Sequence, residues 1–116
     1  MNPTIPPAYV AGAVNITAAT VQNLLALIQA QLAANCPGTA VELMLTADAA
    51  NTAAISVGAA STIKGALSAS NYGYQLPATG GVTRVYRSTY PGNQAPVGEI
   101  QVFSTAAAVL HVELFS

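Results

Sequence analysis

The residues able to do chemistry are few and far apart in this 116-residue chain. It has one histidine, His111, and one cysteine, Cys36. His111 and Glu113 share one face of the last expected strand, and together they supply at most two ligands, whereas a structural zinc site needs four. We therefore expect no metal site, no bound cofactor and no enzymatic activity. His111 is interpreted as a partly buried strand residue.

Neither the cysteine nor the glycines form a recognisable reactive motif. Cys36 follows an expected helix, whereas a reactive thiolate is favoured at a helix N-terminus or beside a cation. We interpret it as a small apolar core residue, and a single cysteine also excludes an internal disulfide. The turn glycines 80, 81 and 92 lack the strand-to-helix context of a phosphate-binding loop, so no nucleotide site is predicted.

One region is rich in the tyrosine and arginine residues that dominate protein interfaces. Three interpretations are open: a protein interface, ordinary residues of a sheet, and a sugar-binding site. The sugar site is the weakest, because acidic and amide side chains do not cluster with the aromatic ones. The candidate residues are Tyr72, Tyr74, Arg84, Tyr86, Arg87 and Tyr90.

The charge of the chain is low for a globular domain. Asp, Glu, Lys and Arg make up 6% of its residues and the net charge is −1, whereas about a quarter of an average domain is charged. Binding to nucleic acid or to an anionic membrane needs clustered Lys and Arg, so we expect neither partner. No apolar run approaches the ~20 residues of a membrane span. Because so few charges protect poorly against self-association, we expect other proteins to cover much of the surface.

The N-terminal residues 1–15 contain three prolines among small residues. Proline lacks a backbone N–H and disfavours both helix interiors and paired strands. We expect an extended arm, either disordered in the isolated protein or ordered against a neighbouring subunit. Its expected anchors are Ile5, Tyr9 and Val10.

Apolar residues at spacings of three and four over residues 21–32 predict an amphipathic helix. The expected helix covers about residues 18–34, with Thr17 or Thr20 as its cap. The sequence Asn-Cys-Pro-Gly at 35–38 ends it. The polar face carries Gln, Asn and Ala, which suits contact with protein, although its apolar face is expected first of all to cover a sheet.

Residues 41–58 predict a β-hairpin. Two segments with period-two alternation, VELMLTA and AAISVG, are joined by residues 48–51, whose short polar side chains favour turns. An isolated hairpin is marginal in water, so other strands or the helix must cover it. The expected inward residues are Val41, Leu43, Leu45, Ile55 and Val57.

Later strands are predicted in VTRVYRSTY from residue 82, in GEIQVFS from residue 98 and in AVLHVELF from residue 108. The last two would form a closing hairpin. One helix followed by six to eight short strands predicts a mainly β fold, an antiparallel β-sandwich or jelly-roll-like barrel. We expect residues 16–116 to form a single domain in which the helix precedes every strand.

Three stretches of the chain resemble small virion structural proteins of tailed bacteriophages, above all capsid decoration, or cement, proteins. They are LTADAANTAAISVG (45–58), YGYQLPATGG (72–81) and GEIQVFSTAAAVLHVELF (98–115). The first pattern is a strand that ends near Ala-Asp and a return strand that ends in Val-Gly. The others are a turn with Gly-Gly and a terminal pair of strands. The resemblance covers roughly residues 41–116 and contains no catalytic signature.

The resemblance implies a compact β-sandwich or jelly-roll-like domain on the outer surface of a capsid, made in the cytoplasm of the host bacterium. The first ten residues, which lack the features of a secretory signal, agree with that origin. The implied partners are the major capsid protein and further copies of the chain, as a homodimer or alternatively a trimer. Such a protein bridges neighbouring capsid subunits and stabilises the head. A tail or fibre module that recognises a host surface is the alternative.

Overall fold

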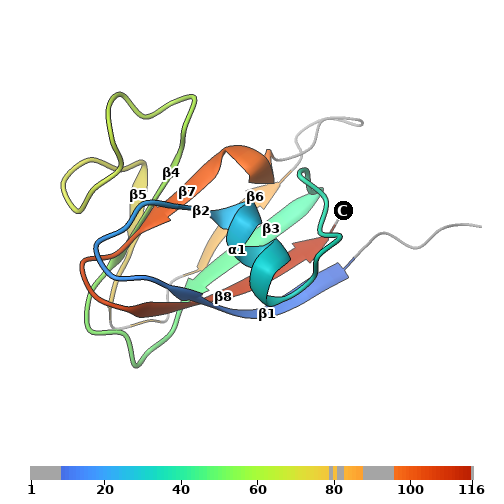
Figure 1. Cartoon of the computed structure of the whole chain (residues 1–116), viewed down its shortest axis with the longest axis horizontal. Coiled ribbons are helices and arrows are strands. Elements are labelled where there is room, and N and C mark those ends of the chain that lie inside the picture. The colour runs from blue at the N-terminus through green and yellow to red at the C-terminus, as the bar shows by residue number, and fades with distance from the viewer. Residues whose placement is uncertain (1–8, 79, 81–82, 88–95, 116) are drawn as a thin grey trace, which may run out of the picture.

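A computed structural model describes residues 9–78, 80, 83–87 and 96–115. Two four-stranded antiparallel sheets pack face to face, with one helix beside them, so the prediction of a mainly β fold with two antiparallel layers is confirmed (Figure 1). The elements are β1 (Tyr9–Ile16), β2 (Gln22–Asn23), α1 (Leu24–Gln31), β3 (Glu42–Ala47), β4 (Ile55–Ala59), β5 (Tyr74–Leu76), β6 (Thr83–Arg87), the 3-10 helix η1 (Val97–Glu99), β7 (Ile100–Phe103) and β8 (Ala108–Phe115).

The strand order shows how the two halves of the chain are combined. Sheet A has the order β1-β8-β3-β6 and sheet B the order β2-β7-β4-β5. The first strand therefore pairs with the eighth, the second with the seventh, the third with the sixth and the fourth with the fifth. Strands that follow each other along the chain mostly lie in different sheets.

The hairpin predicted for residues 41–58 is wrong for this reason. β3 lies in sheet A and β4 in sheet B, and residues 48–54 cross from one sheet to the other. Alternation places Leu43 and Ile55 in the core correctly, but it does not say in which sheet each strand lies. Val41, expected to be buried, precedes β3 and is 48% exposed.

The closing hairpin is wrong in the same way, because β7 belongs to sheet B and β8 to sheet A. The three strands themselves are confirmed, as β6, β7 and β8. Residues 104–107 connect the last two by crossing between the sheets. The small residues of that connection suit a crossing as well as a tight turn, so the sequence does not separate the two.

The prediction of an arm over residues 1–15 is wrong for residues 9–15. They belong to β1, which pairs with the whole of β8 from Tyr9 opposite Phe115 to Ile16 opposite Ala108. The three prolines of residues 1–15 all precede Tyr9, so no proline interrupts the pairing of this stretch with β8. Residues 1–8, with Ile5, lie outside the described residues.

The helix is shorter than predicted. It begins at Leu24 because Gln22 and Asn23 pair with β7, and the Asn23 side chain accepts a hydrogen bond from the Ala26 N–H (3.0 Å) as the helix cap. Thr17 and Thr20 are therefore not its cap. Two strands precede it, contrary to the expected order. No helix of the described chain has the length and apolar character needed to cross a membrane.

The core lies between the two sheets and is closed on one side by α1, which Figure 1 shows between β2 and β1. Sheet A contributes residues such as Leu45 and Leu110, and sheet B residues such as Val57 and Val102. Cys36 is 3% exposed and belongs to this core, as predicted. Burial raises the pKa of its thiol, which keeps it protonated.

Candidate interaction surface

Most side chains of sheet A that point away from the core form three rows across its strands. Strand pairing fixes these rows, because residues directly opposite each other in a ladder lie on the same face. We call this surface the outer face of sheet A. Its rows are Tyr9, Phe115 and Glu42; Ala11, Glu113, Met44 and Val85; and Ala13, His111, Thr46 and Thr83.

Small residues of β1 leave an open groove of about 520 Å³ on this face. Its floor at β1 is Ala-Gly-Ala, next to the larger side chains of β8 and β3. A surface with a groove and few charges offers apolar contact area to another protein. The lining residues are Ala11, Gly12, Ala13, Met44, Thr46, Thr83, His111, Val112 and Glu113.

Tyr9 spans the first two rows at one end of the outer face. Its ring packs on Phe115 with the centroids 4.8 Å apart, and its hydroxyl donates to the Glu113 carboxylate (2.9 Å). This hydrogen bond is the main cause that raises the pKa of the Tyr9 phenol. The contact satisfies one of the few carboxylates of the chain, so the outer face presents less free charge than its sequence suggests.

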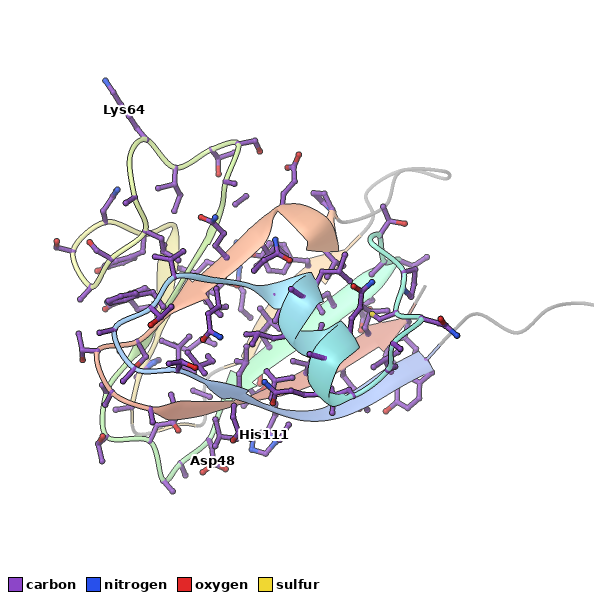
Figure 2. The ribbon with its side chains drawn as sticks, viewed as in Figure 1. Asp48, Lys64 and His111 are labelled. Carbon is purple, nitrogen blue, oxygen red and sulfur yellow. The ribbon has the colours of Figure 1, made fainter. Side chains whose placement is uncertain are left out.

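At the other end of the outer face, His111 pairs with Asp48. Nε2 of His111 lies 2.8 Å from Oδ1 of Asp48, which begins the crossing after β3, and Figure 2 shows the two side chains next to each other. The hydrogen bond from His111, and then that from the Ala50 N–H, lowers the pKa of Asp48. The His111 side chain is 50% exposed, so this strand residue is half-buried on the outer face. Alternation placed His111 on one face with Glu113, but it carried no signal for the pairing with Asp48.

A second group of residues closes the open side of the sandwich between β5 of sheet B and β6 of sheet A. The Arg84 guanidinium lies over the Tyr74 ring at 4.6 Å from its centroid and over the Tyr86 ring at 5.6 Å. The two ring centroids are 6.0 Å apart. The Tyr74 hydroxyl is buried and has no hydrogen-bond partner among the described residues, and burial strongly raises the pKa of this phenol.

The structure divides the predicted interface residues between two opposite edges of sheet A. Tyr74, Arg84 and Tyr86 come together at the β6 edge. Tyr72 lies in the loop before β5 and is 42% exposed, and the backbone of Arg87 pairs with that of Glu42. The predicted residues at the β1 edge are Tyr9 on the outer face and Val10, which packs against the core. Tyr90 lies outside the described residues.

The described residues include no group of three or more His, Cys, Asp or Glu side chains that could hold a metal ion. No protein-family model, curated protein or solved structure matches this chain. What the outer face offers is apolar area, a groove and polar groups that already hydrogen-bond to each other. These groups can bind another protein surface by complementary shape without leaving a buried charge unpaired.

Proposed function

We propose that this protein is a non-enzymatic decoration, or cement, protein of a tailed bacteriophage. It binds the outer surface of the capsid and bridges neighbouring subunits of the major capsid protein, which stabilises the head. The resemblance of residues 45–58, 72–81 and 98–115 to such proteins supports this proposal. The low charge of the chain supports it as well, because a surface that is covered in the assembled particle has little need of charged side chains.

The observation that carries the proposal is the strand order. Eight strands in two four-stranded sheets, with the first half of the chain paired in reverse order with the second, are the arrangement of a jelly roll. We assign this topology to the protein. Jelly rolls occur in viral capsid and lectin domains, but a fold by itself does not fix a function. The evidence for capsid binding therefore has to come from the binding surface.

We assign the outer face of sheet A as the surface that meets the capsid. Two carboxylates on or beside this face have partners within the protein: Glu113 bonds to Tyr9, and Asp48 bonds to His111. Covering them therefore costs less than covering free charges. Beside these pairs, in the same row as Glu113, lie Met44 and Val85, which can pack against an apolar partner surface. Lys64 extends from a loop at the top of the view, away from Asp48 and His111 at the bottom (Figure 2).

Phage particles assembled with and without the protein test the function. Particles that carry it should withstand a higher temperature, or a lower external salt concentration, before they release DNA. The Met44→Glu substitution places a charge at the centre of the outer face. Particles assembled with this variant should bind little of the protein and should lack this protection. The matched control is Ala69→Glu, in the exposed loop between β4 and β5. Equal breakage with and without the protein would contradict the proposal.

A tail or fibre module that recognises a host surface is the second candidate. The exposed Tyr72 and the stacked Arg84 favour it, since aromatic and arginine side chains commonly anchor recognition. The number of copies in each virion separates the two functions. A decoration protein is needed in every capsomer and therefore in large numbers, whereas a tail component is present in few copies.

A further inference from the structure

Strand β1 is an edge strand of sheet A, and one stretch of the backbone at its free edge has no partner among the described residues. β8 lies on one side of β1 and no described strand lies on the other. Near the C-terminal end of β1, the side chain of Gln31 on α1 covers the free edge of the strand. It accepts from the Asn15 N–H (2.7 Å) and donates to the Asn15 carbonyl (3.0 Å). The backbone of Asn15 therefore points away from β8.

The alternation of an antiparallel ladder shows which other residues of β1 point outward. Val109, opposite Asn15, bonds through both its N–H and its carbonyl to Asn51 on the side of β3. The carbonyl of Phe115, opposite Tyr9, likewise accepts from Val41 on that side. Because residues directed toward and away from a neighbouring strand alternate, every second residue of β1 has its N–H and its carbonyl at the free edge. These residues are Tyr9, Ala11, Ala13 and Asn15.

Three of these four residues have no described partner for their outward backbone groups, and they are symmetric about Ala11. A second copy of β1, antiparallel and related by a two-fold axis at Ala11, would place Ala11 opposite the partner's Ala11 and Tyr9 opposite the partner's Ala13. Each pair exchanges two hydrogen bonds, so the three pairs use all six free groups. Asn15, already bonded to Gln31, lies beyond these three pairs. The ladder thus ends where the free groups end.

The side chains near this edge also suit a second copy. No Asp, Glu, Lys, Arg or His occurs before residue 42, so β1, β2 and α1 carry no like charges that would repel across a two-fold axis. Natural edge strands are usually protected by Lys, Pro or a bulge. β1 has none of these between Tyr9 and Ile16. On the outer face, the small Ala11 and Ala13 leave room beside them for the partner's Tyr9.

We infer that this protein forms a two-fold symmetric homodimer in which the β1 strands of two copies pair antiparallel about Ala11. The two copies of sheet A then form one continuous eight-stranded sheet, and their grooves lie on the same face of it. This interface does not depend on the proposed function. It uses the edge of the sheet, whereas the capsid is assigned to the outer face.

Charge variants at the symmetry axis test the dimer in the full chain. The wild-type chain should sediment as a dimer. Ala11→Lys and Ala11→Glu should each weaken dimerisation by at least about tenfold, because like charges would lie directly opposite each other. An equimolar mixture of the two should dimerise again. Ala69→Lys, in the remote loop, should leave the dimer unchanged. A monomeric wild-type chain at every concentration, or no rescue in the mixture of two folded variants, would overturn the inference.

Cysteine cross-linking tests the register in a chain in which Cys36 is replaced by Ala. Directly opposed residues of a hydrogen-bonded antiparallel pair have Cα atoms about 5.5 Å apart, which a disulfide can span. Ala11→Cys should therefore form a covalent dimer on mild oxidation. Ala13→Cys, on the same strand and face, should not, because two copies of residue 13 lie four residues apart along the ladder. A mixture of Tyr9→Cys and Ala13→Cys chains should cross-link. Equal cross-linking of the Ala11→Cys and Ala13→Cys chains would exclude this register.

Discussion

The side chain of Asn51 takes the place of a neighbouring strand for Val109. The Val109 N–H donates to the Asn51 Oδ1 (2.8 Å), and the Asn51 Nδ2 donates to the Val109 carbonyl (2.9 Å). The Asp48 N–H donates to the same carbonyl (3.1 Å). Two residues of the crossing between the sheets therefore continue the ladder of β3 along β8 after β3 itself has ended.

We predict that Asn51→Ala lowers the free energy of unfolding by about 1–3 kcal/mol, because it leaves the Val109 N–H without its partner. Urea unfolding monitored by circular dichroism measures this change. Thr52→Ala is the matched control, since Thr52 is exposed in the same crossing, and it should change stability by less than about 0.5 kcal/mol. Equal effects of the two substitutions would show that the Asn51 contacts contribute little.

The Asp48–His111 pair predicts a dependence of stability on acid pH. The hydrogen bond from His111 holds the pKa of Asp48 below its ordinary value in the folded protein. The unfolded chain therefore takes up a proton first as the pH falls. The stabilisation is present above the unfolded pKa of about 3.9 and is lost as the pH falls through the lower folded pKa.

Asp48→Asn should accordingly flatten the fall in stability below about pH 4, and His111→Ala should flatten it as well, because it removes the main cause of the shift. Urea midpoints measured at a series of pH values between neutral and strongly acidic compare the variants with the wild-type chain. Asp48 is the only aspartate in the chain, so the difference between the wild-type and Asp48→Asn curves gives its contribution. Superimposable curves for all three proteins would show that the pair does not act on stability.

Much of the fold was predictable because alternation reports burial. Leu43, Leu45, Ile55 and Val57 were placed in the core from period-two patterning, and each is buried. The pairing of strands was not predictable, because a hairpin and a crossing between two sheets have the same alternation and similar turn residues. β1 was mistaken for an arm because the prolines before Tyr9 were taken to describe the whole segment.

The candidate surface was predictable only in part. Tyrosine and arginine composition singled out Tyr74, Arg84 and Tyr86, which the structure brings together, whereas their role in an interface stays a prediction. The pairs Asp48–His111 and Asn51–Val109 join residues about sixty positions apart. Only the neighbouring position of β3 and β8 brings them together, and local sequence carries no signal of that neighbourhood.

The buried hydroxyl of Tyr74 leads to a prediction about stability. It has no hydrogen-bond partner in the described part of the chain, so the folded state loses its hydration without compensation. We predict that Tyr74→Phe leaves the free energy of unfolding unchanged or raises it by up to about 2 kcal/mol. Tyr74→Leu, which also removes the ring beneath Arg84, should lower it by about 1–3 kcal/mol. Thermal and urea unfolding of both variants measure the difference, and a destabilised Tyr74→Phe protein would reveal a hydrogen bond made by the hydroxyl.

The turn at Gly80 provides a test of how the crossing after β3 packs. Gly80 has φ +71°, a conformation that costs other residues roughly 1–2 kcal/mol. A Cβ atom there would lie 2.9 Å from the Cα of Ala49. Because both the conformation and the contact involve backbone atoms, no rotation of a side chain relieves them. Gly80→Ala should therefore lower the free energy of unfolding by at least about 2 kcal/mol.

Gly98→Ala is the matched control for this substitution. A Cβ atom at Gly98 would meet its nearest neighbour, the Cδ2 of Leu25, at 3.7 Å, an ordinary van der Waals distance. The added methyl group should change stability by less than about 1 kcal/mol. Urea midpoints of the two variants give the comparison directly. If Gly80→Ala were no less stable than Gly98→Ala, the turn would not lie against Ala49, and the crossing that carries Asp48 and Asn51 would be held by its contacts with β8 alone.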